Sequence, residues 1–180
     1  MKATGIVRRI DDLGRVVIPK EIRRTMRIRE GDPLEIFTDN DGEVIFKKYS
    51  PIGELATFAG QYADVLYKTG GIPVLVCDRD HVVAVSGVPR KELLERRVSS
   101  QLEEMMDGRR TYVYSTKDQR KLQPIEGVER YALSAAPILA SGDVSGSVMF
   151  LIPESGAVAG DADNKLIQAA AMFLGKQLEE

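Results

Sequence analysis

Residues 8–24 read RRIDDLGRVVIPKEIRR and decide the fold of the N-terminal end. The stretch interleaves basic side chains with short apolar runs. Residues 1–29 hold nine Lys or Arg against three Asp or Glu, a local net charge of +6, whereas the whole chain has a net charge of −2. This asymmetry predicts that the N-terminal end meets a polyanion while the rest of the chain has another role.

Around this stretch the residue pattern predicts short strands, a turn and a helix. Residues 11–14, Asp-Asp-Leu-Gly, have the composition of a turn, and Pro19 suits the first turn of a helix. The pair Asp41-Gly42 is a strong hairpin signal. The predicted elements are strands over 3–10 and 15–18, a helix over 20–27, and hairpin strands over 33–38 and 43–48.

The composition is that of a soluble globular protein with one large or two small domains: 180 residues, 43% hydrophobic and 29% charged. No apolar run approaches the ~20 residues that span a bilayer, so no membrane partner is expected. Cys77 is the single cysteine and His81 the single histidine, so an internal disulfide and a Cys- or His-based metal site are not expected. We therefore expect a cytoplasmic protein without a resident metal or cofactor.

Motifs of catalysis are not recognisable in the chain. The sequence has no Walker-type phosphate loop, no nucleophile elbow and no convincing pair of carboxylates. Cys77 lies in an apolar run, where inert packing is expected. The alternatives are a redox role or a dyad with His81, four residues later, and nothing else in the sequence supports either. We therefore expect no catalytic residues and no enzymatic activity.

A second region begins at Ser50-Pro51. Its predicted elements are a helix over 52–66, strands over 72–78 and 81–86, helices over 90–97 and 100–106, strands over 111–116, 131–140 and 144–152, and a last helix capped by Asp161 or Asp163. This order predicts an antiparallel sheet with helices on its faces, so the fold class is α+β with domains 1–50 and 51–180. The first and last helices of the second domain are expected to lie close together, because each flanks the same sheet.

The N-terminal domain is small for a solitary fold. A domain of about 50 residues makes a poor hydrophobic core and usually needs a metal, a disulfide or a second copy. Since the first two are not expected, we predict an intertwined homodimer. Pairing would also double the excess charge of +6 to about +12.

The pattern Arg-x-x-Asp-x-x-Gly-Arg-Val-Val-Ile-Pro-x-x-Ile-Arg-Arg over residues 8–24, followed by Gly31-Asp32, resembles the AbrB-type DNA-binding domain of bacterial transition-state regulators. The resemblance covers about residues 3–48. It implies a swapped-hairpin dimeric β-barrel whose basic face binds double-stranded DNA, with DNA-facing arginines at Arg8, Arg15, Arg23 and Arg24. The chemistry of arginine agrees, because its guanidinium makes bidentate contacts with phosphate and with guanine edges.

The order of elements after residue 51 resembles a GAF domain, an antiparallel sheet with flanking helices that often holds a small effector. A ligand would then sit between the sheet and the helices around 90–117. The candidate lining residues are Val76, Val85, Ser86, Tyr112 and Ser134. The alternative is a filled core without a ligand, and any effector is unidentified.

Apolar stripes on the first and last helices of this domain suit an interface between subunits. The residues expected at the interface are Phe58, Leu66, Leu174 and Leu178. Together with the N-terminal dimer, such an interface would make a homotetramer. The alternative is that each stripe only covers its own sheet.

These observations predict a bacterial DNA-binding transcription regulator, located in the cytoplasm at the nucleoid, with a C-terminal domain that oligomerises and has a small molecule as a candidate effector. The whole chain is similar to a family of sporulation regulators, which implies control of sporulation genes. Residues 51–180 carry a net charge of −4, so they are not expected to bind DNA themselves. The alternative is a small-molecule-binding module whose basic N-terminus contacts a protein or RNA. Antitoxins share the N-terminal fold, but they usually carry short disordered tails, whereas 51–180 is predicted to fold.

Overall fold

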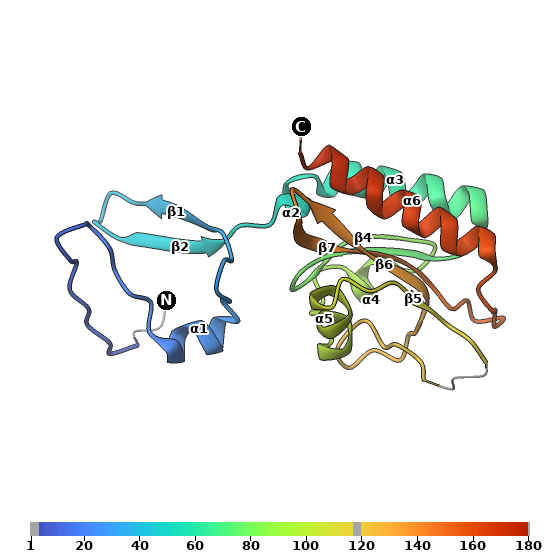
Figure 1. Cartoon of the computed structure of the whole chain (residues 1–180), viewed down its shortest axis with the longest axis horizontal. Coiled ribbons are helices and arrows are strands. Elements are labelled where there is room, and N and C mark those ends of the chain that lie inside the picture. Colours follow the sequence, from blue (N-terminus) through green and yellow to red (C-terminus); the bar gives the residue numbers. More distant parts are fainter. Residues whose placement is uncertain (1–3, 117–119, 180) are drawn as a thin grey trace. The chain divides into compact units, whose positions relative to one another are not determined.

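The computed structural model describes residues 4–116 and 120–179, and it divides between Tyr49 and Ser50 into two compact units (Figure 1). The N-terminal unit contains one helix and one hairpin. Its elements are α1 (Lys20–Met26), β1 (Leu34–Thr38) and β2 (Val44–Lys48). The two strands are antiparallel, and their register runs from Leu34 opposite Lys48 to Thr38 opposite Val44. The predicted helix and hairpin are therefore confirmed.

Turn chemistry sets the ends of these elements. Helix α1 follows Pro19 and ends at Arg27, which takes a left-handed conformation at φ 51° and lets the Ile28 N–H donate to the Arg23 carbonyl at 2.8 Å. In the hairpin turn, the Asp39 carboxylate accepts hydrogen bonds from the backbone N–H groups of Asp41 and Glu43 at 3.1 and 2.9 Å. This side chain thereby mimics a backbone turn partner.

The two strands predicted over residues 3–10 and 15–18 do not form within the single chain. Residue 3 lies outside the described residues, and residues 4–18 contain only the turn that begins at Asp11. A strand needs a neighbour for its backbone N–H and C=O groups. The described part of this chain supplies no such neighbour to the segment.

The C-terminal unit is built on a five-stranded antiparallel sheet in the order β4-β3-β7-β6-β5. Its helices are α2 (Pro51–Glu54), α3 (Ala56–Gly70), α4 (Arg90–Leu93), α5 (Ser100–Asp107) and α6 (Asp161–Gln177). Its strands are β3 (Val74–Asp78), β4 (Val82–Ser86), β5 (Tyr112–Val113), β6 (Ala132–Ala140) and β7 (Asp143–Leu151). The fold class is thus α+β, as predicted.

Two apolar cores lie on the two faces of this sheet. Helices α3 and α6 cover one face, where Phe150, Ile167 and Leu174 are fully buried (Figure 1). Helices α4 and α5 cover the other, where Leu102 and Met149 are fully buried. The first and last long helices lie side by side as predicted, because the ring of Phe173 contacts the rings of Phe58 and Tyr62 at centroid distances of 5.9 and 5.2 Å.

Helix α6 approaches the sheet so closely at Gly175 that a Cβ there would collide with the Leu139 carbonyl oxygen at the end of β6. Glycine therefore permits backbone-to-backbone packing between the two elements. No helix among residues 4–116 and 120–179 has the length and hydropathy that a bilayer crossing requires.

The helix predicted over 52–66 is two helices, α2 and α3, separated at Leu55. Other boundaries differ from prediction as well. The helix predicted over 90–97 ends at Leu93, because Glu95 turns to φ 61° and its N–H donates to the Val82 carbonyl at 3.0 Å. The strand predicted over 111–116 keeps only the two residues of β5. The N-cap of α6 is Gly160 and not Asp161 or Asp163; the Asp163 carboxylate accepts from the Gly160 N–H at 2.9 Å.

Candidate nucleic-acid interface

The four predicted DNA-facing arginines lie around one turn and on one helix. Arg8 precedes the turn at Asp11, and Arg15 follows it. Arg23 and Arg24 are consecutive residues in the second half of α1. All four side chains are exposed, so each guanidinium can reach a partner outside the chain.

Asp11 is the centre of the turn. Its carboxylate accepts hydrogen bonds from the backbone N–H groups of Leu13 at 3.0 Å and Arg15 at 2.8 Å, and from the Arg15 Nε at 2.8 Å. The backbone closes the same turn, with the Asp11 N–H donating to the Arg15 carbonyl at 3.0 Å. These hydrogen bonds from Arg15 are the main cause that lowers the pKa of Asp11 from its usual value.

The contact with Asp11 uses only the Nε of the Arg15 guanidinium. Because Nε is bonded to Asp11, the guanidinium plane is oriented while both terminal nitrogens stay outside the pair. The Arg15 side chain is 70% exposed. Those two nitrogens form the edge with which arginine binds phosphate or the O6 and N7 of guanine.

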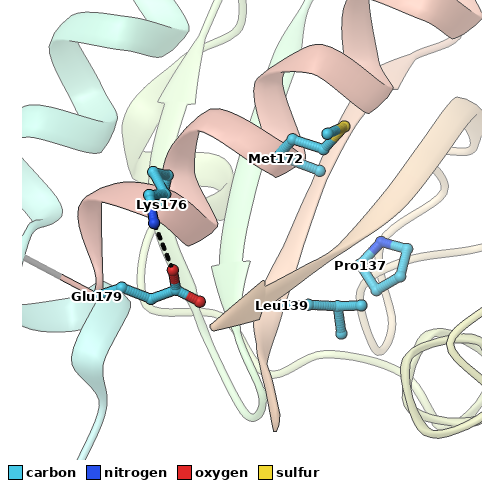
Figure 2. A pocket seen from close by; sticks show the side chains of 6 residues that line it. Pro137, Leu139, Met172, Lys176 and Glu179 are labelled. Carbon is cyan, nitrogen blue, oxygen red and sulfur yellow. Dashed lines mark hydrogen bonds and ion pairs between the residues drawn. The ribbon is translucent and has the colours of Figure 1, made fainter. Parts of the chain in front are cut away.

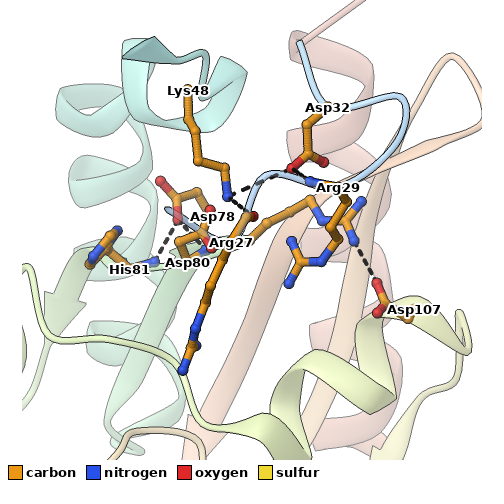
Figure 3. Close-up of polar contacts among 9 residues, drawn as sticks. Arg27, Arg29, Asp32, Lys48, Asp78, Asp80, His81 and Asp107 are labelled. Atoms are coloured by element: carbon orange, nitrogen blue, oxygen red, sulfur yellow. Dashed lines mark hydrogen bonds and ion pairs between the residues drawn. The ribbon is translucent and has the colours of Figure 1, made fainter. Parts of the chain in front are cut away.

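A second polar cluster fixes the chain after α1 against the hairpin. Figure 3 shows the Lys48 ammonium directed at the carboxylate of Asp32 and the carbonyl oxygen of Arg27, at 3.7 and 2.9 Å. The Asp32 carboxylate also accepts from the Arg29 backbone N–H at 2.8 Å. The Asp32 side chain is only 7% exposed, so this ion pair is largely shielded from water. We infer a structural role, in which Lys48 of β2 holds the end of α1 in place.

The N-terminal unit has almost no core of its own. Among its described residues, Pro19 alone is buried. Many of its large apolar side chains are exposed, and those more than half exposed are Val7, Ile10, Leu13, Val17, Met26, Ile36 and Val44. Exposure of so many apolar side chains in one small unit marks an interaction surface.

The five residues predicted to line a ligand pocket in the C-terminal unit do not come together. Val76 is buried on the face under α3 and α6, whereas Val85 and Tyr112 belong to the core on the opposite face. The Ser86 hydroxyl donates to Asp64 of α3 at 2.6 Å, and Ser134 is buried beside Phe150 in the strand register. The prediction was based on which strands these residues occupy. It did not assign each side chain to one of the two faces of the sheet.

The structure has a shallow groove elsewhere, between β6 and the last turns of α6. Its volume is about 260 Å³, and its walls are Pro137, Leu139, Ala171, Met172, Lys176 and Glu179. Figure 2 shows Lys176 and Glu179 at one end, paired with each other at 3.1 Å. With its two charges already paired and its other walls apolar, the groove offers little to orient a polar ligand.

No three side chains of the metal-ligating types gather in the part of the chain that the structure describes. Burial raises the pKa of the Cys77 thiol strongly, which disfavours the reactive thiolate. Its Sγ lies 3.6 Å from the Ser147 carbonyl oxygen, which it contacts as a weak donor.

The predicted oligomer interface divides in the same way. Leu66 and Leu174 are buried in the core of one chain, so they cannot contact another subunit. Phe58 and Leu178 are half-buried against that core. The exposed large apolar positions on these helices are instead Val65 at 56%, Tyr67 at 37%, Met172 at 76% and Phe173 at 43%.

Comparisons with known proteins agree with this two-part organisation. Residues 54–179 match the family model "Stage V sporulation protein T C-terminal, transcription factor", and residues 7–53 match "Antidote-toxin recognition MazE, bacterial antitoxin". Stage V sporulation protein T of Bacillus subtilis is 52% identical over 182 residues, covering 100% of both chains. The transition state regulatory protein AbrB of the same species is 63% identical over 51 residues, which are 28% of this chain and 52% of AbrB.

A solved structure supports the fold of the larger unit. The GAF domain/HD domain protein from Geobacter sulfurreducens superposes with a TM-score of 0.50 at 14% identity, over 73% of this chain and 95% of that one. At this identity the likeness concerns the fold alone.

Proposed function

The chain belongs to the stage V sporulation protein T family of transcription factors, and we propose that its N-terminal unit binds double-stranded DNA as a homodimer. The observation that carries this proposal is the turn that orients Arg15 while exposing its terminal nitrogens. In this view residues 1–50 are the DNA-binding domain and residues 51–180 the regulatory and oligomerisation domain. The alternative function is a small-molecule-binding module whose basic N-terminus contacts a protein or RNA. Membership of a family of transcription factors does not favour it.

Exposed apolar surface supports the homodimer. Burying a Val, Leu or Ile side chain is worth about 1.5–3 kcal/mol, and the N-terminal unit leaves many such side chains in solvent. A second copy supplies both a cover for them and a strand neighbour for residues 4–18. The resemblance to AbrB-type domains implies such a swapped-hairpin barrel.

Charge supports DNA as the ligand of that dimer. The N-terminal 29 residues carry a net charge of +6, so a pair presents about +12 to a phosphate backbone. Phosphate contacts supply affinity and register, and the free edges of Arg15, Arg23 and Arg24 supply candidate contacts to bases. Such a protein would work in the cytoplasm, at the nucleoid, on sporulation genes.

The C-terminal unit is proposed to join these dimers into a larger assembly. Val65, Met172 and Phe173 leave an exposed apolar area on α3 and α6, where a second C-terminal unit could pack. Joining several DNA readers raises the apparent affinity without any new DNA contact. This function needs neither a catalytic step nor a bound effector.

The test is DNA binding by matched variants of the full chain. The variant Arg15→Ala/Arg23→Ala removes two proposed contacts, while Arg9→Ala/Lys47→Ala removes two exposed charges that have no proposed contact. For a dimer with six to eight phosphate contacts, the wild-type log–log salt slope should be roughly −5 to −7. The first variant should lose about 100-fold in affinity and the second much less. Equal losses would show that only net charge matters, and an absence of DNA binding by the wild type would overturn the proposal.

A further inference from the structure

The C-terminal unit carries one strongly basic segment in an otherwise acidic sequence. Residues 108–122 contain five Lys or Arg against one Asp, whereas residues 51–180 as a whole have a net charge of −4. Four of these cations lie in the described part of the chain, and we name them the basic edge: Arg109, Arg110, Arg120 and Lys121.

The fold brings the basic edge to the rim of the sheet. Helix α5 ends at Asp107, and Arg109 reverses the chain with a left-handed φ of 49°. The N–H groups of Arg109 and Arg110 donate to the last carbonyls of the helix, at 2.9 and 3.1 Å. The chain then enters β5, the terminal strand of the sheet next to β6 (Figure 1).

A tyrosine holds the second half of the basic edge beside the first. The Tyr112 hydroxyl donates to the Arg120 carbonyl at 3.0 Å and accepts from the Leu122 N–H at 3.1 Å. Because Tyr112 begins β5, the Arg120–Leu122 backbone is bound to the strand that Arg109 and Arg110 lead into. The backbone is thus held on both sides of the basic edge, and the four side chains of the basic edge are exposed.

The charges of the basic edge are not neutralised within the described chain. The carboxylate of Asp107, the last residue of α5, pairs with Arg79 at 2.5 Å. Among residues 4–116 and 120–179, no carboxylate pairs with Arg109, Arg110, Arg120 or Lys121. Lys121 instead lies over the rings of Tyr114 and Tyr131, at 5.8 and 5.2 Å from their centroids. Ring faces position an ammonium and leave its charge available to an anion.

We propose that the basic edge is a second DNA-contacting surface that binds the phosphodiester backbone. This inference rests on the proposed DNA binding by the N-terminal unit, and it departs from the expectation, based on net charge, that residues 51–180 do not touch DNA. DNA held by the N-terminal unit is at high effective concentration for a surface joined to it at Ser50-Pro51. Phosphate contacts of this kind raise affinity and salt dependence but carry no base preference.

The test compares two triple variants of the full chain in fluorescence anisotropy with duplex DNA at several salt concentrations. The edge variant is Arg109→Gln/Arg110→Gln/Arg120→Gln, which leaves Lys121 on its tyrosines. The control variant is Arg90→Gln/Arg96→Gln/Arg97→Gln, which removes three charges from exposed arginines of the same unit that have no ion pair within the described residues. Circular dichroism and melting temperature confirm that both variants fold.

The edge variant should bind about tenfold more weakly, and the magnitude of its salt slope should fall by about 1–3 units per bound protomer, near 0.9 for each lost phosphate. Its relative preference among DNA sequences should match the wild type, and the control should keep most of the affinity and slope. Wild-type binding by the edge variant, or equal losses in both variants, would overturn this inference and leave the N-terminal interface standing. If the basic edge binds an acidic protein and not DNA, the edge variant should bind DNA as the wild type does. If the wild type binds no DNA, the proposed function itself fails.

Discussion

The carboxylate of Asp11 orients the guanidinium of Arg15 by accepting from both its backbone N–H and its Nε, each at 2.8 Å. An acid beside an arginine that binds DNA is unfavourable by simple charge counting, since it repels phosphate. The geometry explains its presence, because one oxygen closes the turn and the other fixes the plane of the arginine. Asp11 is thus a positioning residue in the proposed interface.

Replacing Asp11 should therefore weaken DNA binding although it removes a negative charge. We expect Asp11→Asn to bind about three- to tenfold more weakly in anisotropy titrations, because the charge-assisted hydrogen bonds that orient Arg15 are lost. Asp12→Asn is the matched control, because Asp12 is exposed in the same turn and its side chain has no partner among residues 4–116 and 120–179. It should bind as well as the wild type or better. Equal behaviour of the two variants would contradict the positioning role.

The ion pair between Glu92 and Arg130 should make stability depend on pH. Arg130 donates to both carboxylate oxygens of Glu92, at 2.8 and 3.1 Å, and these bonds lower the pKa of Glu92 from its usual 4.5. A lowered pKa stabilises the fold above the unfolded value and loses that effect as pH falls through the folded value. Since the Glu92 side chain is 36% exposed, we expect Glu92→Gln to cost only about 1–2 kcal/mol at pH 7. In melting curves, the difference in stability between the two proteins should be full above the usual pKa of 4.5 and should close as the pH falls through the lowered pKa of Glu92; a difference that does not change with pH would rule out this origin.

Two helix glycines should respond oppositely to alanine. A Cβ at Gly175 would meet the Leu139 carbonyl oxygen, so Gly175→Ala must displace α6 or β6 and should cost about 1–3 kcal/mol. A Cβ at Gly60 in α3 would have no atom within 4 Å apart from its chain neighbours and the nearby backbone of its own helix, so Gly60→Ala should stabilise by about 0.5–1 kcal/mol. Urea unfolding measures both free energies. If both variants were stabilised, α6 and β6 would not be in backbone contact.

Charged residues on the exposed part of α6 should break the proposed assembly. We expect Met172→Glu to reduce the mass in sedimentation while leaving the N-terminal dimer intact, because Met172 is 76% exposed and outside the core. Thr111→Glu places the same charge at an exposed position away from α3 and α6 and should keep the wild-type mass. Leu174→Ala should act differently, lowering the free energy of unfolding by about 2–5 kcal/mol as a core truncation. If Met172→Glu keeps the wild-type mass, this surface of α6 is not part of the proposed interface between C-terminal units.

Residues 1–50 should not fold as a monomer, because their described part buries only Pro19. The melting temperature of this fragment is expected to rise with protein concentration, and light scattering should give the mass of a dimer. A melt that does not depend on concentration, with a monomeric mass, would refute the pairing.

Local chemistry made much of the fold predictable. The Asp41-Gly42 turn and Pro19 marked the hairpin and α1, and the two long amphipathic patterns located α3 and α6. The failures have a common cause, since they depend on what each element meets in space. Residues 4–18 have strand composition but no strand neighbour within the described chain. Val76 and Val85 look equivalent in sequence, yet the pairing of Leu75 with Val85 places them on opposite faces.

The interface residues show the same limit. Leu66 and Met172 lie on helices with similar apolar patterns, and only the position of the sheet decides that the first is buried and the second exposed. The Asp11–Arg15 contact had a readable signal, because an Asp before a Gly-containing turn accepts from N–H groups two and four residues later. The spacing of residues gives no sign that the Tyr112 hydroxyl binds the backbone of Arg120 and Leu122.

The near absence of a core in the N-terminal unit has a consequence for how the cell handles this protein. A newly made chain that has not met a partner would carry an extended apolar segment on an otherwise stable C-terminal unit, which is the kind of target that proteases and chaperones capture. Chains without a partner would then be degraded before paired chains. If the proposed dimer is the form that binds DNA, the number of dimers rises with the square of the chain concentration when chains are scarce. A modest rise in synthesis would therefore give a steeper rise in promoter occupancy.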